Sequence, residues 1–371
     1  MTADESELRE LRSSVREFLE DKSPEEAVRK LMESEPRFDP AVWAQAADQL
    51  RLPGLALPEE YGGDGFGMVE LGVVLEESGR ALWCAPLFAT VVLAAQALLA
   101  AGDAEACARL LPGIAAGRTT AALAVAEDSG SWDPALVSAR AVPAGNGRWK
   151  LRGRKSFVVD GTTADLILVV ARTVAGPSLF AVDRQATGLT AEPMETLDAT
   201  RAMARLTFDA VPATLVGAEG AGGRIMARVL DTASTGLAAE QAGGARRCLE
   251  MSVDHARVRH QFGRPIGSFQ AVKHKCADML VQLELAEAAS REAARLADEE
   301  SAESPVASAV AHACCSRAYM VAAMENIQVH GGIGFTWEHP AHLYFRRAKS
   351  SQLLFGGPAV YHERLLDRLG I

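Results

Sequence analysis

The chain has 371 residues and a formal net charge of −10, with a pI near 5.4. This length exceeds what a single hydrophobic core usually serves, so two or three domains are expected. The acidic balance disfavours a nucleic-acid-binding protein, which would present a basic face to phosphates. Residues 1–21 are acidic and helical in pattern and lack the basic start and apolar stretch of a signal peptide, which favours a cytoplasmic protein.

The hydrophobic pattern divides the chain into three predicted domains. Residues 1–118 repeat apolar side chains at helical spacing, which predicts an N-terminal helical domain. Residues 119–215 hold short alternating or β-branched runs separated by turn residues, which predicts a central β-barrel or sandwich. Residues 216–371 return to helical spacing, typical of a four-helix-bundle-like domain. The predicted fold class is therefore an α+β multidomain protein.

Individual elements follow from the same pattern. Strands are expected in the runs 121–127, 136–142, 147–153, 155–161, 165–171, 178–184 and 204–211. One helix is expected along the apolar stripe formed by Phe269, Val272, Cys276, Met279 and Leu283, and another over 306–329. The acidic run 297–303 and the turn-rich run 58–67 are predicted to be surface loops.

Two further features bear on the fold. Segment 85–101 is the most apolar part of the chain, but it is shorter than the roughly 20 residues of a membrane span and contains Gln96. A buried helix is therefore predicted there. The six cysteines form no CxxC pair and show no regular spacing, so they are expected to be reduced core residues.

Two motifs can be interpreted as ligand contacts or as plain structure. Arg259 and Arg264 flank an interruption of the helical pattern, where a guanidinium can pair with a pyrophosphate or bond a helix C-terminus. Gly331, Gly332 and Gly334 follow a long predicted helix. Glycines there allow close approach of a phosphate to backbone N–H groups, or simply end the helix with a turn. The residues alone leave both interpretations open.

Other chemistries find no support in the sequence. There is no GxSxG elbow for Ser/His/Asp catalysis and no HExxH motif, so no metal site is predicted. Structural or exposed roles are expected for the histidines His255, His260, His274, His330, His339, His342 and His362.

Four segments, in fixed order, resemble the acyl-CoA dehydrogenase family. They are PEEYGG with EESGR (58–63 and 76–80), RVRHQFGRPIGSFQAVKHKCADM (257–279), QVHGGIGFTWEHP (328–340) and YFRRAKSSQLLFGG (344–357). The resemblance covers nearly the whole chain. It implies the three-part helix, strand, helix fold, FAD as cofactor, and an acyl-CoA substrate from fatty-acid or steroid side-chain β-oxidation.

The resemblance also implies site residues. Family residues that contact FAD match six positions of this chain, which are Arg259, Phe262, Gln270, Gln328, Gly331 and Gly332. Asp231 matches a position that touches the CoA part of the substrate, whereas Ser234 stands where an arginine is usual.

The family's catalytic base is missing. A carboxylate must remove the α-proton of the thioester, yet Phe355 stands where the family has its glutamate. A second family location for the base falls on Ala233. Glu240 is the nearest following carboxylate, but it lies nearly two helical turns beyond Ala233. No catalytic residue is therefore predicted in this chain.

Residues that hold the flavin ring in the family are also replaced. Ala126 stands in place of a hydroxyl residue, and 157–159 reads Phe-Val-Val where a Trp-x-Thr triplet is usual. After Phe355, Gly357 and Ala359 replace polar residues. The chain thus lacks donors that a subunit of the family uses for its own flavin.

The pattern of retained and lost residues implies a partner. In family homodimers the arginine, the glutamine and the glycines reach the cofactor from the neighbouring subunit, and these are the contacts this chain keeps. It resembles the non-catalytic chain of heteromeric actinobacterial acyl-CoA dehydrogenases, which implies a heterotetramer with a homologous subunit that supplies the glutamate. Two alternatives stay open: a homotetrameric flavoenzyme that uses another base or chemistry, and a structural or regulatory pseudoenzyme.

Overall fold

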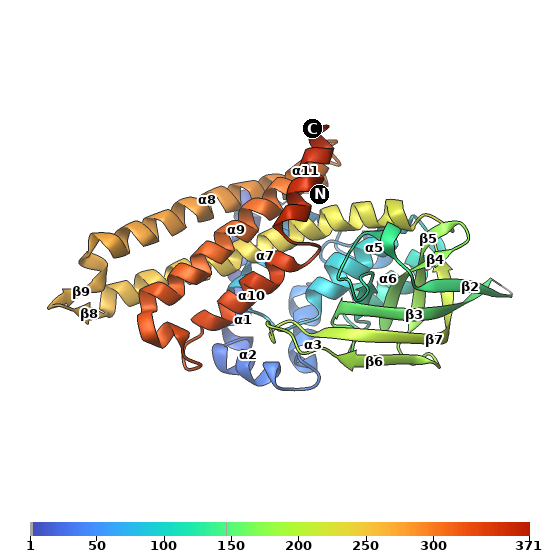
Figure 1. Ribbon diagram of the computed structural model, residues 1–371, viewed down its shortest axis with the longest axis horizontal. Helices are drawn as coiled ribbons and strands as arrows, with labels where there is room; N and C mark the ends of the chain where they lie inside the picture. The colour runs from blue at the N-terminus through green and yellow to red at the C-terminus, as the bar shows by residue number, and fades with distance from the viewer. Residues whose placement is uncertain (1–2, 146) are drawn as a thin grey trace. The chain divides into compact units, whose positions relative to one another are not determined.

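The computed structural model describes residues 3–145 and 147–371. These residues form two compact units (Figure 1). The first unit contains Lys30–Gly67 and Cys84–Ala233, and the second contains Ala3–Arg29, Met68–Trp83 and Ser234–Ile371. The long helix α7 (Gly222–Val258) contributes residues to both units.

Helical segments come before and after the strands in sequence. Those before are α1 (Glu5–Lys22), α2 (Glu25–Met32), α3 (Pro40–Leu50), η1 (Glu59–Tyr61), α4 (Met68–Arg80), η2 (Phe88–Ala95), α5 (Gln96–Ala101) and α6 (Ala104–Ala115). Those after α7 are η4 (Ile266–Ser268), α8 (Gln270–Asp298), α9 (Ser304–His330), η5 (Gly331–Phe335), α10 (Ala341–Leu353) and α11 (Pro358–Leu369). None of the helices in the described parts of the chain combines the length and apolar character needed to cross a membrane.

The sheet of the first unit closes into a barrel. Its strands are β1 (Ala121–Ala124), β2 (Arg140–Gly145), β3 (Arg148–Val159), β4 (Leu166–Thr173), β5 (Gly176–Asp183), β6 (Leu189–Pro193) and β7 (Met203–Val216). The pairing runs β4-β2-β3-β7-β5 and returns to β4, while β1 pairs with β4 and β6 with β7. The long strands β3 and β7 lie side by side (Figure 1). Of the two predicted architectures, the barrel is the one formed.

Several predicted strand limits were wrong. Runs 147–153 and 155–161 are one continuous strand, because Gly153 adopts φ +136° and bends β3 without ending it. Run 136–142 becomes a strand only from Arg140, since η3 (Pro134–Leu136) precedes it. The edge strand β6 was not predicted, because most of its side chains are polar or exposed.

Segment 85–101 is helical and buried, as predicted, although its middle part is a π-helix, η2. Every residue of η2 is buried. Its one hydroxyl residue, Thr90, accepts a hydrogen bond from the Ala121 N–H at 3.0 Å and donates to the Ala121 carbonyl oxygen at 3.2 Å. The hydroxyl thus joins η2 to the first strand of the barrel.

The helices of the second unit pack at close range because the contacting residues are small. Helices α8, α9 and α10 run beside the second half of α7 (Figure 1). The core shared by α7, α8 and α9 is made of Ala238, Ala286, Ala293, Ala311, Cys315 and Ala318. At α7, a methyl group on Gly243 would lie 1.7 Å from the Glu76 carbonyl oxygen of α4, and one on Gly244 would lie 2.4 Å from Cζ of Tyr319 on α9. Helix α7 therefore contacts α4 and α9 at glycines, where no side chain separates its backbone from the neighbouring helix.

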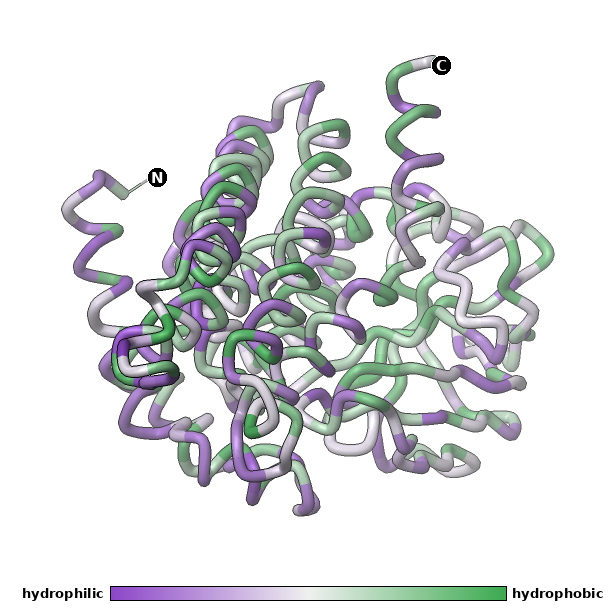
Figure 2. The backbone as a smooth tube through the Cα atoms, turned by 60° about the vertical axis from the view of Figure 1, so that its left-hand side comes forward, coloured by the Kyte–Doolittle hydropathy of each residue, from purple (hydrophilic) through white to green (hydrophobic). Residues whose placement is uncertain are grey.

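Apolar and cysteine side chains also occur at the surface. The helix that ends at the C-terminus, α11, alternates between hydrophilic and hydrophobic residues (Figure 2), and Leu366 and Leu369 are exposed. All six cysteines are free, but Cys314 is exposed and Cys276 is half-buried, so the prediction of core cysteines was wrong for these two.

The first two residues of the predicted loop 297–303 belong to α8, and the second of them caps another helix. Asp298 ends α8, and its two carboxylate oxygens accept hydrogen bonds from the first two N–H groups of α4, at 2.5 Å from Met68 and 2.9 Å from Val69. These N–H groups have no partner inside their own helix. Burial raises the pKa of Asp298, and the two N–H groups act in the opposite direction. The prediction of a purely solvated segment was wrong for this residue.

Replacing Asp298 with alanine should lower the free energy of unfolding by about 1 to 2 kcal/mol, because two helix-end N–H groups lose their acceptor. Urea denaturation of the full chain measures the change. Asp278→Ala, at an exposed position of the same helix, is the control and should leave the midpoint unchanged. Equal midpoints for the two variants would show that the cap does not stabilise the fold.

Candidate functional site

The first predicted cofactor segment is a hairpin between α7 and α8. Arg259 follows the last residue of α7, and β8 (His260–Gln261) pairs with β9 (Arg264–Pro265). Phe262 and Gly263 form the two-residue turn, with φ values of 52° and 77°. Positive φ at both positions is what a type I′ hairpin turn requires. The hairpin displays Phe262 with 91% of its surface exposed, and the Arg259 side chain is exposed as well.

Contacts within the hairpin fix its backbone. The Arg264 guanidinium lies 4.1 Å from the ring centroid of Phe269, and the rings of Phe262 and Phe269 meet edge to face at 6.1 Å. The Arg259 N–H donates to the His255 carbonyl at 2.9 Å, and the Arg259 carbonyl accepts from the Ile266 N–H at 2.7 Å. Arg264 is thus engaged with an aromatic ring, whereas Arg259 has a fixed backbone and a side chain directed to solvent.

The second predicted cofactor segment is the end of α9. Gln328 is exposed in its last turn, and Gly331 follows the helix with φ +65° and ψ −140°, a conformation suited to glycine. The Gly331 N–H bonds the end of its own helix, so it is not a free donor. An added Cβ at Gly331 or Gly332 would meet nothing within 4 Å, so a ligand can approach this backbone closely.

Three stacked histidines connect the two segments. The rings of His255 on α7 and His330 on α9 lie 4.3 Å apart between centroids, and the rings of His330 and His339 lie 4.1 Å apart. His255 precedes Arg259 by about one helical turn, and His330 directly precedes Gly331. The structure therefore brings Arg259 and the Gln328–Gly332 segment into one region. The sequence analysis missed this stack, and the only signal for it was the position of two histidines beside the predicted contacts.

The remaining predicted contacts are described within their own units. Gln270 is the first residue of α8 and is exposed. Asp231 is half-buried in the part of α7 that belongs to the first unit.

In the barrel, the positions that hold the flavin ring in the family offer no side-chain donors. Ala126, Val158 and Val159 are buried, and Phe157 is half-buried with φ +57°. These residues do not fit a ring-binding role. By contrast, the exposed Arg259 and the open backbone at Gly331 and Gly332 fit the phosphate end of a dinucleotide.

A buried ion pair braces the strands beside Ala126. The ammonium of Lys155 is fully buried and lies 3.0 Å from a Glu127 carboxylate oxygen and 2.8 Å from the Val125 carbonyl. Burial lowers the pKa of Lys155 to about 8, and Glu127 acts against that shift. The same carboxylate accepts hydrogen bonds from the N–H groups of Ser138 and Ala139. These polar groups are thus satisfied within the barrel.

Buried apolar side chains occupy both positions where the family places its catalytic base. Phe355 is fully buried and adopts φ +66° in the turn after α10. Ala233 is buried in α7. The Glu240 carboxylate is also buried and lies 2.8 Å from a guanidinium nitrogen of Arg347. Glu240 is therefore paired inside the second unit, which argues against its use as a base.

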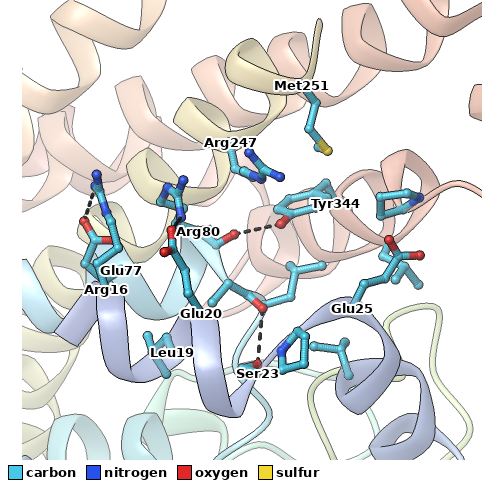
Figure 3. A pocket seen from close by; sticks show the side chains of 16 residues that line it. Arg16, Leu19, Glu20, Ser23, Glu25, Glu77, Arg80, Arg247, Met251 and Tyr344 are labelled. Carbon is cyan, nitrogen blue, oxygen red and sulfur yellow. Dashed lines mark hydrogen bonds and ion pairs between the residues drawn. The ribbon is translucent and has the colours of Figure 1, made fainter. Parts of the chain in front are cut away.

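A cavity of about 350 Å³ opens between α1, α2, α4, α7 and α10 in the second unit (Figure 3). Its charged lining consists of three arginines and three glutamates, which are Arg16, Arg80, Arg247, Glu20, Glu25 and Glu77. Arg16 contacts Glu77 at 2.7 Å, and Arg80 contacts Glu20 at 3.3 Å. The lining is thus balanced in charge, and none of the predicted cofactor residues belongs to it. In the described parts of the chain, no group of three or more His, Cys, Asp or Glu side chains is suited to hold a metal ion.

Comparison with known families agrees with this geometry. The acyl-CoA dehydrogenase N-terminal domain matches residues 5–118, the middle domain matches 122–211, and the C-terminal domain matches 220–370. The chain belongs to the acyl-CoA dehydrogenase family. It is an oxidoreductase of that family, whose members depend on FAD. The predicted fold of an N-terminal helical, a middle β and a C-terminal helical part is confirmed.

Individual relatives match over almost the full length. The chain is 37% identical to acyl-CoA dehydrogenase IpdE2 of Mycobacterium tuberculosis, over 96% of this chain and 95% of that protein. A variant of the Tcur3481-Tcur3483 steroid ACAD matches with a TM-score of 0.89 and 36% identity, covering 98% of each chain. The ChsE4-ChsE5 complex of Mycobacterium tuberculosis matches with a TM-score of 0.89 and 28% identity, over 99% of this chain and 98% of the other.

Replacing Phe355 with alanine should destabilise the protein by about 3 to 5 kcal/mol, because a fully buried aromatic ring leaves a cavity. Leucine at the same position should cost less, about 1 to 2 kcal/mol. Urea denaturation measures both. Phe335→Ala is the control, since that ring is 82% exposed and its loss should change the midpoint little. Equal effects at the two positions would contradict a packing role for Phe355.

Proposed function

We propose that this chain is the base-lacking subunit of a heteromeric, FAD-dependent acyl-CoA dehydrogenase. In this role it completes the FAD site of a homologous partner subunit, which supplies the catalytic glutamate. One observation carries the proposal. The residues expected to contact a cofactor from a neighbouring subunit lie exposed on the second unit, whereas the position expected to hold the base contains the buried Phe355.

The surface around the two cofactor segments supports a covering partner. Phe262, Phe335 and Trp337 are 91%, 82% and 62% exposed, and Ile333 is 48% exposed. Large apolar side chains gathered on adjoining segments are typical of a surface that another chain covers. The two solved relatives carry paired names, the Tcur3481-Tcur3483 steroid ACAD and the ChsE4-ChsE5 complex. On the same grounds the proposed substrate is an acyl-CoA, including one whose acyl group is a steroid side chain.

The roles of this chain's own residues follow from their chemistry. In the family, bound FAD accepts the hydride that leaves the β-carbon of the substrate. The Arg259 guanidinium pairs with the pyrophosphate, and the fixed hairpin holds its backbone in place. Gln328 and the open backbone at Gly331 and Gly332 line the same ligand. Asp231 contributes to CoA binding. Removal of the α-proton falls to the partner, because Phe355 cannot accept a proton and Glu240 is held by Arg347.

The isolated chain should carry little FAD, because only the phosphate-end contacts are present. Co-expression with the homologous chain of a neighbouring gene should give a complex with about one FAD for each pair of unlike chains. Flavin absorbance against protein concentration gives both ratios. A ratio near one for the isolated chain would favour the homotetramer. A partner that binds FAD equally well with and without this chain would favour the pseudoenzyme.

Replacing Arg259 with alanine should weaken FAD binding by the complex roughly 10- to 100-fold, because a charge-assisted pairing with phosphate is lost. Flavin released on dilution measures the affinity. Arg257→Ala is the matched control, since Arg257 is an exposed arginine two residues earlier that lies 3.8 Å from Asp254. Unchanged affinity in Arg259→Ala would assign Arg259 to structure only.

A further inference from the structure

We propose that His255, His330 and His339 are positioning residues that hold the two cofactor segments together while the rings are neutral and release them in mild acid. The inference rests on the proposed function, because it assigns the segments to FAD. Its geometric basis stands by itself. The three rings pack in series at the C-terminal ends of α7 and α9 and two residues before α10, at centroid distances of 4.3 and 4.1 Å and interplanar angles of 34° and 43°.

Backbone hydrogen bonds fix where each proton sits. The Nδ1 of His330 lies 2.8 Å from the Asn326 carbonyl oxygen, so this nitrogen carries the hydrogen and donates. The Nδ1 of His339 accepts from the Ala341 N–H at 3.2 Å, so its hydrogen sits on Nε2. A second proton on His339 would have to occupy Nδ1 and face the Ala341 N–H. It would also place a cation at the N-terminus of α10, which is unfavourable.

The surroundings also disfavour a charged stack. Burial lowers the pKa of His339 to about 4, and the neighbouring rings and Arg29 of α2 add to the effect. Burial likewise lowers the pKa of His255, helped by His330 and Arg259, and lowers that of His330, where the Asn326 carbonyl opposes the shift. The pKa of His342, the next histidine on α10, is lowered by burial and by Arg29 and Arg346, with Glu25 acting in the opposite sense.

The direction of the pH effect follows from these shifts. A histidine released from the stack has a pKa near 6.5, whereas His339 in the stack has a pKa of about 4. Between these values the released form binds more protons, so the stack loses stability as the pH falls from about 6.5 to about 4. Because His255 and His330 adjoin Arg259 and Gly331, release separates the residues that would hold the phosphates.

Hydrogen exchange tests the opening without reference to FAD. In the full chain, exchange of peptides covering 328–340, corrected for the intrinsic pH effect, should rise roughly tenfold from pH 7.5 to pH 5.0. His255→Phe keeps an aromatic ring in the stack and removes one titratable group, so its response should be smaller. His362→Phe, an exposed histidine on α11, is the control and should respond like wild type. Equal corrected exchange at both pH values, or an unchanged response in His255→Phe, would overturn the proposal.

The positioning role is tested with FAD as the probe. The complex of this chain with its homologous chain is titrated with FAD. Its dissociation constant for FAD should rise roughly tenfold as the pH falls from 7.5 to 5.0, and should rise less in His255→Phe. Affinity that stays constant while exchange increases would refute the positioning role. A complex that binds no FAD at pH 7.5 would refute the proposed function, and the exchange data would still decide whether the stack opens in acid.

Discussion

The second unit depends on the absence of side chains where α4 and α7 cross. A Cβ on Gly79 would lie 2.0 Å from the Glu240 carbonyl oxygen, and one on Gly243 would lie 1.7 Å from the Glu76 carbonyl oxygen, so each helix presses a glycine against the backbone of the other. The Glu240 side chain also pairs with Arg347 of α10, with 2.8 Å between its carboxylate oxygen and a guanidinium nitrogen. Helix α10 then leads directly into the turn that buries Phe355. A contact between two backbones is thus linked, through one buried ion pair, to the helix that precedes this turn.

The motif EESGR is explained by contacts of α4 with α7 and with α1, without a ligand. Glu77 is buried and receives both Arg12 and Arg16 of α1, at 3.0 and 2.7 Å, and Glu76 accepts from Arg12 at 2.9 Å. Such pairs add little net stability, but removal of one partner leaves a buried charge at a cost of about 3 to 5 kcal/mol. These pairs join α1 to α4.

Periodicity was sufficient to predict the order of helical and strand regions, because it depends only on which residues are apolar and how they are spaced. Periodicity failed where a residue's role depends on a contact with a residue far away in the sequence. Asp298 looks like part of an acidic loop until the start of α4 lies against it, and Gly153 looks like a strand end until the continuous pairing of β3 with β7 is known. The histidine stack joins residues 75 positions apart, His255 and His330, and no local pattern relates them. The resemblance to a family pointed to the predicted cofactor segments, but their exposure and hairpin geometry came only from the structure.

The phenylalanines Phe157, Phe262 and Phe355 have positive φ, a conformation unfavourable for a bulky residue, and each stands in a segment singled out by the resemblance. Of these, Phe262 is exposed to solvent, as are Phe335 and Trp337 of the same unit. A copy of the chain synthesised without any companion subunit presents these rings to the cell's chaperones and proteases. Under the proposed function, the abundance of the folded chain depends on the supply of the subunit that covers that surface. Balanced synthesis of the two polypeptides is then needed for stability as well as for catalysis.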